Sequence, residues 1–198
     1  YQPSDPVKLV FVGAETWTAA SGARGLTGYA INPETSTWLS VTDARGAGMD
    51  PTFTPQNSYQ NTSLWGGRTM NRRMGRLLHL KDPRIDQHGS IALRLESSVE
   101  EGQSLRQLTD TLSPDILHQD WGAAFADLKG RLGSGLRRGA FPQPCLIAPK
   151  GFGSYRFDEM RQTYFWDVID HQGQSEAISL DVEHGTMERL SALQGQTK

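Results

Sequence analysis

Cationic side chains recur along one acid-free stretch of the chain, and their chemistry suits the binding of phosphate or carboxylate groups. Residues 51–81 contain no Asp or Glu, although the whole chain of 198 residues has a net charge of −2. Guanidinium groups bind both anions through paired hydrogen bonds, and neighbouring aromatic rings can stack on nucleic-acid bases. The candidate binding residues are therefore the cations and two aromatic side chains of this stretch: Arg68, Arg72, Arg73, Arg76, Lys81, Tyr59 and Trp65.

Two explanations fit the charge of this stretch. The cations could meet an external partner, which would be either an acidic protein surface or the phosphate backbone of a nucleic acid. Alternatively, they could pair with the second half of the same chain, where acidic residues accumulate between positions 158 and 188. The sequence does not decide between an external partner and internal charge pairing.

Sequence motifs for catalysis or cofactor binding are missing from the chain. There is no Gly-x-x-x-x-Gly-Lys-Ser/Thr, no Gly-x-Gly-x-x-Gly after the first predicted strand, and no Gly-x-Ser-x-Gly. The five histidines never occur at zinc-ligand spacing, so we predict no metal ligand. Because the motifs above are missing, we also predict no catalytic residue and no cofactor. An enzyme of unrecognised type remains a further alternative because two turns contain short acid–histidine clusters, Asp82 with Asp86 and His88, and Asp167 with Asp170 and His171.

Cysteine content and hydropathy indicate the cellular compartment in which the protein works. The single Cys145 cannot form an intramolecular disulfide, and its apolar surroundings indicate a small core residue. No apolar run approaches the ~20 residues that a membrane-spanning helix needs, and the given sequence does not open with a charged segment followed by an apolar one. We therefore expect a cytoplasmic protein with no membrane partner. Because the chain begins at Tyr1 without Met, it could be a fragment of a longer protein.

Strand patterns dominate residues 1–98. Runs of branched and aromatic residues end at Gly, Pro or Asn, as strands do. Residues 32–36 have the composition of a turn, so we predict a hairpin there, and we predict a second hairpin around residues 82–89. The expected strands are Val7–Val12, Leu26–Ile31, Thr37–Thr42, Arg76–Lys81 and Ile91–Leu95, and they would form a small barrel or a curled antiparallel sheet.

The candidate binding residues coincide with a helical pattern. Apolar side chains recur at helical spacing over Arg68–Leu78, and arginines occupy the opposite arc. This predicts a short amphipathic helix between the two hairpins, and the helix and the following strand compete for residues 76–78. Its inward residues would be Met70, Met74 and Leu77, and its outward residues would be Arg68, Arg72 and Arg73.

The second half of the chain has a different pattern. Residues 99–104 are polar and acidic, and we interpret them as a linker. Leucines at 105, 108 and 112 predict one helix, and Asp120–Leu132 predicts another with Asp120 as its N-cap. An antiparallel meander should follow, built from Cys145–Ala148, Tyr155–Phe157, Thr163–Ile169 and Ala177–Val182, before a closing helix over Thr186–Leu193. The predicted fold class is α+β, with a β-rich half at 1–98, a linker at 99–104 and a helix-then-meander half at 105–198.

Four short segments resemble a region of bacterial SWIM zinc-finger proteins. They are Gly25-Leu26-Thr27-Gly28-Tyr29, the run Trp38–Arg45, the run Asp50–Phe53 and Ser63-Leu64-Trp65-Gly66. Such proteins are often encoded beside a MoxR-type AAA+ ATPase and a von Willebrand factor A protein. The family's Cys-x-Cys and Cys-x-His pairs cannot exist here with Cys145 alone, so no zinc ligand carries over. The resemblance implies a non-catalytic accessory module in an ATPase-linked bacterial system, with one of those two proteins as its partner.

These observations together predict a non-enzymatic adaptor module that recruits a protein partner through its arginine-rich face. Nucleic-acid binding through the same face, from Arg68 to Lys81, is the alternative. The predicted charge segregation, the missing catalytic motifs and the family resemblance support the adaptor hypothesis.

Overall fold

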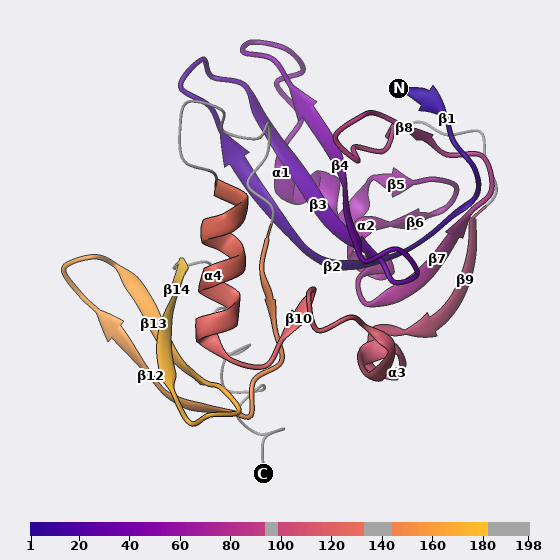
Figure 1. Ribbon diagram of the computed structural model, residues 1–198. Coiled ribbons are helices and arrows are strands. Elements are labelled where there is room, and N and C mark those ends of the chain that lie inside the picture. Colours follow the sequence, from indigo (N-terminus) through magenta and orange to yellow (C-terminus); the bar gives the residue numbers. More distant parts are fainter. Residues whose placement is uncertain (94–98, 133–143, 182–198) are drawn as a thin grey trace. The chain divides into compact units, whose positions relative to one another are not determined.

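The computed structural model describes residues 1–93, 99–132 and 144–181 (Figure 1). These residues group into two compact units: the first contains residues 1–93 and 99–113 with Pro144, and the second contains residues 114–132 and 145–181. No helix in the described part of the chain is long and apolar enough to cross a membrane. The predicted closing helix, Thr186–Leu193, lies outside the described residues.

An antiparallel sheet of five strands forms the centre of the first unit. Its order is β4-β3-β2-β7-β9, so that β4 and β9 are the edges. The strands are β2 (Val7–Thr18), β3 (Arg24–Asn32), β4 (Thr37–Arg45), β7 (Arg76–Leu80) and β9 (Val99–Ser104). The predicted β3–β4 hairpin is confirmed, and the Asn32 side chain accepts hydrogen bonds from the backbone N–H groups of Glu34 and Thr35 in its turn.

Short elements complete the core of the first unit. They are β1 (Gln2–Pro3), α1 (Pro55–Asn61), β5 (Ser63–Leu64), β6 (Arg68–Thr69), α2 (Met70–Arg73), β8 (Arg84–Ile85), α3 (Leu105–Leu108) and the 3-10 turn η1 (Thr109–Thr111). Helix α2 lies very close to the sheet at Gly28, where an added Cβ would come within 2.7 Å of the Met70 sulfur. The buried core is apolar and includes Leu9, Phe11, Leu26, Leu39, Val41, Trp65, Met70, Leu78, Leu80 and Ile91.

The second unit combines one helix with two sheets. Strands β10 (Leu117–His118) and β11 (Leu146–Ile147) pair in parallel, while β12 (Gly151–Asp158), β13 (Thr163–Ile169) and β14 (Ser175–Asp181) form an antiparallel sheet. Helix α4 (Trp121–Leu132) packs its buried residues Trp121 and Ala124 against Val168 and neighbouring apolar side chains. This packing gives the second unit a core of its own.

Asp170 joins the start of α4 to the β13–β14 turn. Its side chain is buried, and it accepts hydrogen bonds from the backbone N–H groups of Trp121, Gln172 and Gln174 at 2.8 to 3.0 Å. Burial alone would raise the pKa of this carboxyl, but these N–H donors outweigh the burial and lower the pKa below its ordinary value of 3.8. The ionised carboxylate therefore stabilises the fold of the second unit.

Replacing Asp170 by Asn should destabilise the second unit in a pH-dependent way. Because the folded pKa is lowered, the carboxylate contributes fully above the unfolded pKa near 3.8 and loses its contribution as the pH falls through the lower folded value. The denaturant midpoints of the wild type and of Asp170→Asn should therefore differ most at neutral pH and converge in strong acid. Asp82→Asn, at an exposed position, is the control. A deficit of the same size at every pH would contradict this role.

Several predicted features differ from the structure. The fold is β-rich with several antiparallel sheets, as predicted, but none of the described sheets closes into a barrel. Residues 99–104 are not a linker, because they form the edge strand β9 and pair with β7. Strand β7 pairs with β2 and β9, so the predicted hairpin between Arg76–Lys81 and Ile91–Leu95 does not form within the described residues. A polar sequence fits an edge strand because one backbone edge and many of its side chains meet water.

Candidate binding surface

The arginine-rich segment is not one amphipathic helix. Helix α2 contains only Met70–Arg73, with β6 before it and β7 after it. The helix ends because Met74 leaves the helical conformation, with a ψ of 132°, and Gly75 has a φ of +68°, which strongly favours glycine. The N–H of Gly75 then donates to the carbonyl of Phe11 at 2.9 Å, and this bond directs the chain into β7. Met70 lies inward as predicted, with only 3% of its surface exposed.

Arg73 lies inside the molecule, contrary to the prediction that it faces outward. Only 2% of its surface is exposed. Its guanidinium donates to the carbonyl oxygens of Leu64 and Trp65, both at 3.1 Å, and to Glu101 Oε1 at 3.4 Å. Burial lowers the pKa of Arg73, and the negative charge of Glu101 opposes that effect. Arg73 therefore holds the β5–β6 turn in place and is not available to a partner.

Two other cations of the segment are paired with strand β9. The guanidinium of Arg68 contacts Glu101 Oε2 at 2.7 Å, and Lys81 Nζ contacts Glu100 Oε1 at 2.5 Å. The hydrogen bond with Glu100 raises the pKa of Lys81. Both cations remain about half exposed, so these ion pairs contribute little to stability. Internal charge pairing thus occurs with Glu100 and Glu101, and these carboxylates lie in the stretch interpreted as a linker.

Arg72 and Arg76 differ from their neighbours. Both are exposed, and neither makes an ion pair or a side-chain hydrogen bond with any residue in the described part of the chain. Arg72 lies on α2 and Arg76 begins β7, separated by the Gly75 turn. They are the two cations of the segment whose guanidinium groups are free to bind an anion from outside.

The predicted aromatic residues are not positioned as an open stacking surface. Trp65 is 4% exposed, stacks on Phe11 with ring centroids 5.9 Å apart, and donates from Nε1 to the carbonyl of Ala92. Tyr59 is partly buried and packs against the same apolar core. Trp65 therefore cannot stack on a base unless the core opens.

A second group of side chains was not predicted from the sequence. His118, Asp127 and Cys145 come together in the second unit, and the donor atoms of the three lie within 4.8 Å of one another. His118 is the last residue of β10, Asp127 lies on α4, and Cys145 directly precedes β11. No spacing rule links positions so far apart in sequence, and only the parallel pairing of β10 with β11 beneath α4 brings them together.

Comparisons with known proteins do not identify the chain. No protein-family model matches it, and no curated protein is significantly similar to it. One solved structure, described as "Structural mimicry for functional antagonism", has 8% sequence identity with this chain and covers 92% of this chain and 75% of its own. The TM-score of that match is 0.30, so it carries no argument about fold or function.

Proposed function

We propose that this chain is a non-enzymatic, cytoplasmic adaptor module that recruits a protein partner through an acidic patch on that partner. The exposed pair Arg72 and Arg76 carries the proposal. In a segment where Arg73 is buried and both Arg68 and Lys81 contact carboxylates, these two arginines alone keep unpaired guanidinium groups within the described residues. Arginines of this kind bind carboxylates bidentately, and complementary charge speeds association.

The resemblance to SWIM zinc-finger proteins suggests which partners to test first. An AAA+ ATPase of the MoxR type and a von Willebrand factor A protein are the candidates, in a bacterial ATPase-linked system. We expect Arg72 and Arg76 to make the main contacts with either partner. Arg68 and Lys81 are about half exposed but already contact carboxylates, so they would contribute less.

Nucleic-acid binding through Arg68–Lys81 is the second candidate function. The burial of Trp65 weighs against it, because single-strand binding of this type depends on exposed rings as well as cations. Duplex binding through phosphate contacts alone needs no stacking. The exposed cations of the segment therefore favour duplex binding through phosphates over recognition of single-stranded bases.

Reversing the charge of Arg72 and Arg76 should weaken partner binding by about tenfold or more, since each reversal replaces an attraction by a repulsion. The variant is Arg72→Glu plus Arg76→Glu, tested by pull-down and by titration against a purified ATPase of the candidate class. The matched control is Arg84→Glu plus Arg161→Glu, which makes the same change of charge at two exposed sites outside the segment. Equal loss in both double variants would point to net charge and would contradict a defined surface.

Titration of labelled single- and double-stranded oligonucleotides at several salt concentrations separates the two candidate functions. If Arg68, Arg72, Arg76 and Lys81 neutralise about four phosphates, the log of the affinity should fall against log salt with a slope of about −3 to −4. The adaptor function predicts no oligonucleotide binding at low salt. Steep salt dependence that the Arg72→Glu plus Arg76→Glu variant reduces would establish the nucleic-acid function in its place.

A further inference from the structure

The group formed by His118, Asp127 and Cys145 combines three different metal-binding atoms. His118 is 6% exposed, and its Nε2 lies 3.0 Å from Asp127 Oδ2. The thiol of Cys145 faces the same place and lies 3.9 Å from the carbonyl of Ala124, one helical turn before Asp127. All three residues belong to the second unit: His118 lies on β10, Asp127 lies on α4, and Cys145 directly precedes β11.

Backbone pairing fixes the positions of two of these residues. His118 is the last residue of β10 and pairs with Ile147 of β11, and its carbonyl accepts a hydrogen bond from Ala148. Cys145 directly precedes β11 and packs with Ile147 against Trp121 and Ala124 of α4. Because the site is built on strands and a helix, its donors need little reorganisation to bind a ligand.

We infer that His118, Asp127 and Cys145 form a three-ligand site for a zinc-class divalent transition metal, with one tetrahedral position left for a fourth ligand. Imidazole, carboxylate and thiolate are the donors that Zn²⁺ takes in proteins, at about 2.0–2.3 Å. Donors around one such ion stand about 3–4 Å apart, so separations of up to 4.8 Å require a movement of about 1 Å.

Metal binding changes the protonation of the site. The ligand form of cysteine is the thiolate, so the ion displaces the Cys145 proton to solvent. When the metal binds, the contact between His118 Nε2 and Asp127 is replaced by two metal–ligand bonds.

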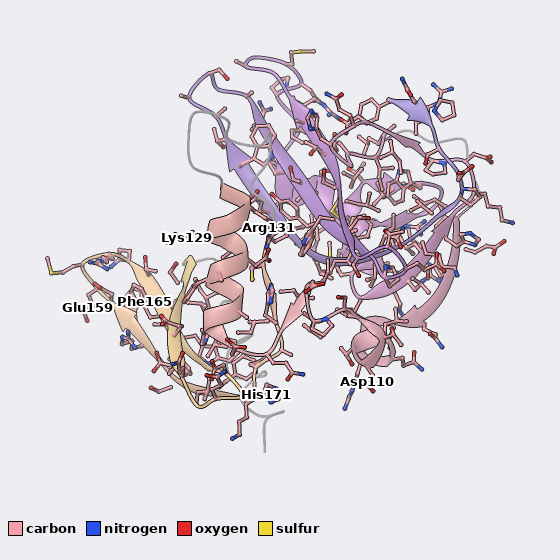
Figure 2. All side chains as sticks on the ribbon, viewed as in Figure 1. Asp110, Lys129, Arg131, Glu159, Phe165 and His171 are labelled. Atoms are coloured by element: carbon pink, nitrogen blue, oxygen red, sulfur yellow. The ribbon has the colours of Figure 1, made fainter. Side chains whose placement is uncertain are left out.

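Arg131 opposes the metal. Its guanidinium contacts Asp127 Oδ2 at 2.5 Å, one turn further along α4 (Figure 2). A metal must share this carboxylate with Arg131 and must bind near its positive charge. Removing that charge should therefore strengthen metal binding. A purely structural hydrogen-bond network predicts no such gain.

Cobalt(II) titration of the reduced full chain tests the site. We expect one equivalent of Co²⁺ to bind with a near-ultraviolet thiolate-to-cobalt charge-transfer band and with the visible bands of a tetrahedral ion, and we expect Zn²⁺ to displace it. Cys145→Ser should abolish the charge-transfer band and weaken binding at least tenfold, while Arg131→Gln should tighten binding several-fold. His171→Gln is the matched control, since His171 lies exposed in the β13–β14 turn (Figure 2).

Circular dichroism of each variant separates loss of ligand from loss of fold. If Cys145→Ser fails to fold, the site is still tested by the charge-transfer band of the wild type and by the metal affinity of Arg131→Gln. Absence of a charge-transfer band in the folded wild type would overturn the site. So would weaker binding in Arg131→Gln, or binding that His171→Gln removes and Cys145→Ser leaves unchanged.

Discussion

Replacing Arg73 by Ala should destabilise the first unit by about 3–5 kcal/mol, whereas the same change at Arg72 should alter its stability by less than about 0.5 kcal/mol. The two arginines are neighbours on the four-residue helix α2, yet one is buried and the other exposed. Removing Arg73 leaves the carbonyls of Leu64 and Trp65 without their guanidinium donor and opens a cavity under the β5–β6 turn. Each buried carbonyl without a donor costs about 1–3 kcal/mol.

Urea unfolding followed by tryptophan fluorescence measures both effects. Arg73→Met is an informative third variant, because it fills much of the cavity and still leaves both carbonyls without a donor. It should fall between the wild type and Arg73→Ala. If Arg72→Ala and Arg73→Ala are equally stable, the buried position of Arg73 is wrong and the segment presents all its arginines to solvent.

The contrast between Arg72 and Arg73 also explains why the sequence predicted the segment incorrectly. A helical arc places both arginines on one face, because positions 68, 72, 73 and 76 cluster at 100° per residue. That arc exists only if the helix continues past residue 74, and the left-handed backbone at Gly75 ends it. Moreover, the acceptors that bury Arg73 are backbone carbonyls, which carry no signal in a sequence pattern.

Strands with local turn signals were predictable. The β3–β4 hairpin follows from the Asn-Pro-Glu-Thr-Ser turn, and Asn32 performs the local capping that its residue type favours. Strand β9 was not predictable in this way. Its sequence Val-Glu-Glu-Gly-Gln-Ser has the composition of a linker, and it becomes a strand only because β7 offers it a free edge. Tertiary pairing of this kind overrides local propensity.

The two clusters of charged groups illustrate the same limit. Glu100 and Glu101 neutralise part of the basic segment although the acidic residues were expected to act from the second half of the chain. His118, Asp127 and Cys145 meet through the β10–β11 pairing and α4. In both cases the partners lie on or beside different elements that only the tertiary fold brings together, so sequence spacing does not predict the contact.

Replacing Trp65 by Ala should also destabilise the first unit by about 3–5 kcal/mol, because a large buried ring leaves a cavity that the core refills only in part. Trp65 stacks on Phe11 and bonds to Ala92, and it does so from a left-handed backbone conformation, with a φ of +49°, that leads into Gly66 and Gly67. Trp65→Phe keeps most of the ring contact but loses the hydrogen bond to Ala92 and a small part of the buried volume. Its cost should be about 1–3 kcal/mol.

Comparing these two variants with the charge reversal at Arg72 and Arg76 separates stability from binding. A core residue changes the midpoint of unfolding and leaves the affinity of the folded molecule for its partner unchanged, so Trp65→Phe should bind the partner as the wild type does. An exposed stacking residue behaves in the opposite way, since its loss lowers the affinity for single strands by about 1–3 kcal/mol per base without affecting the fold. A stable Trp65→Ala variant with reduced oligonucleotide affinity would therefore contradict both the burial of this ring and the adaptor function.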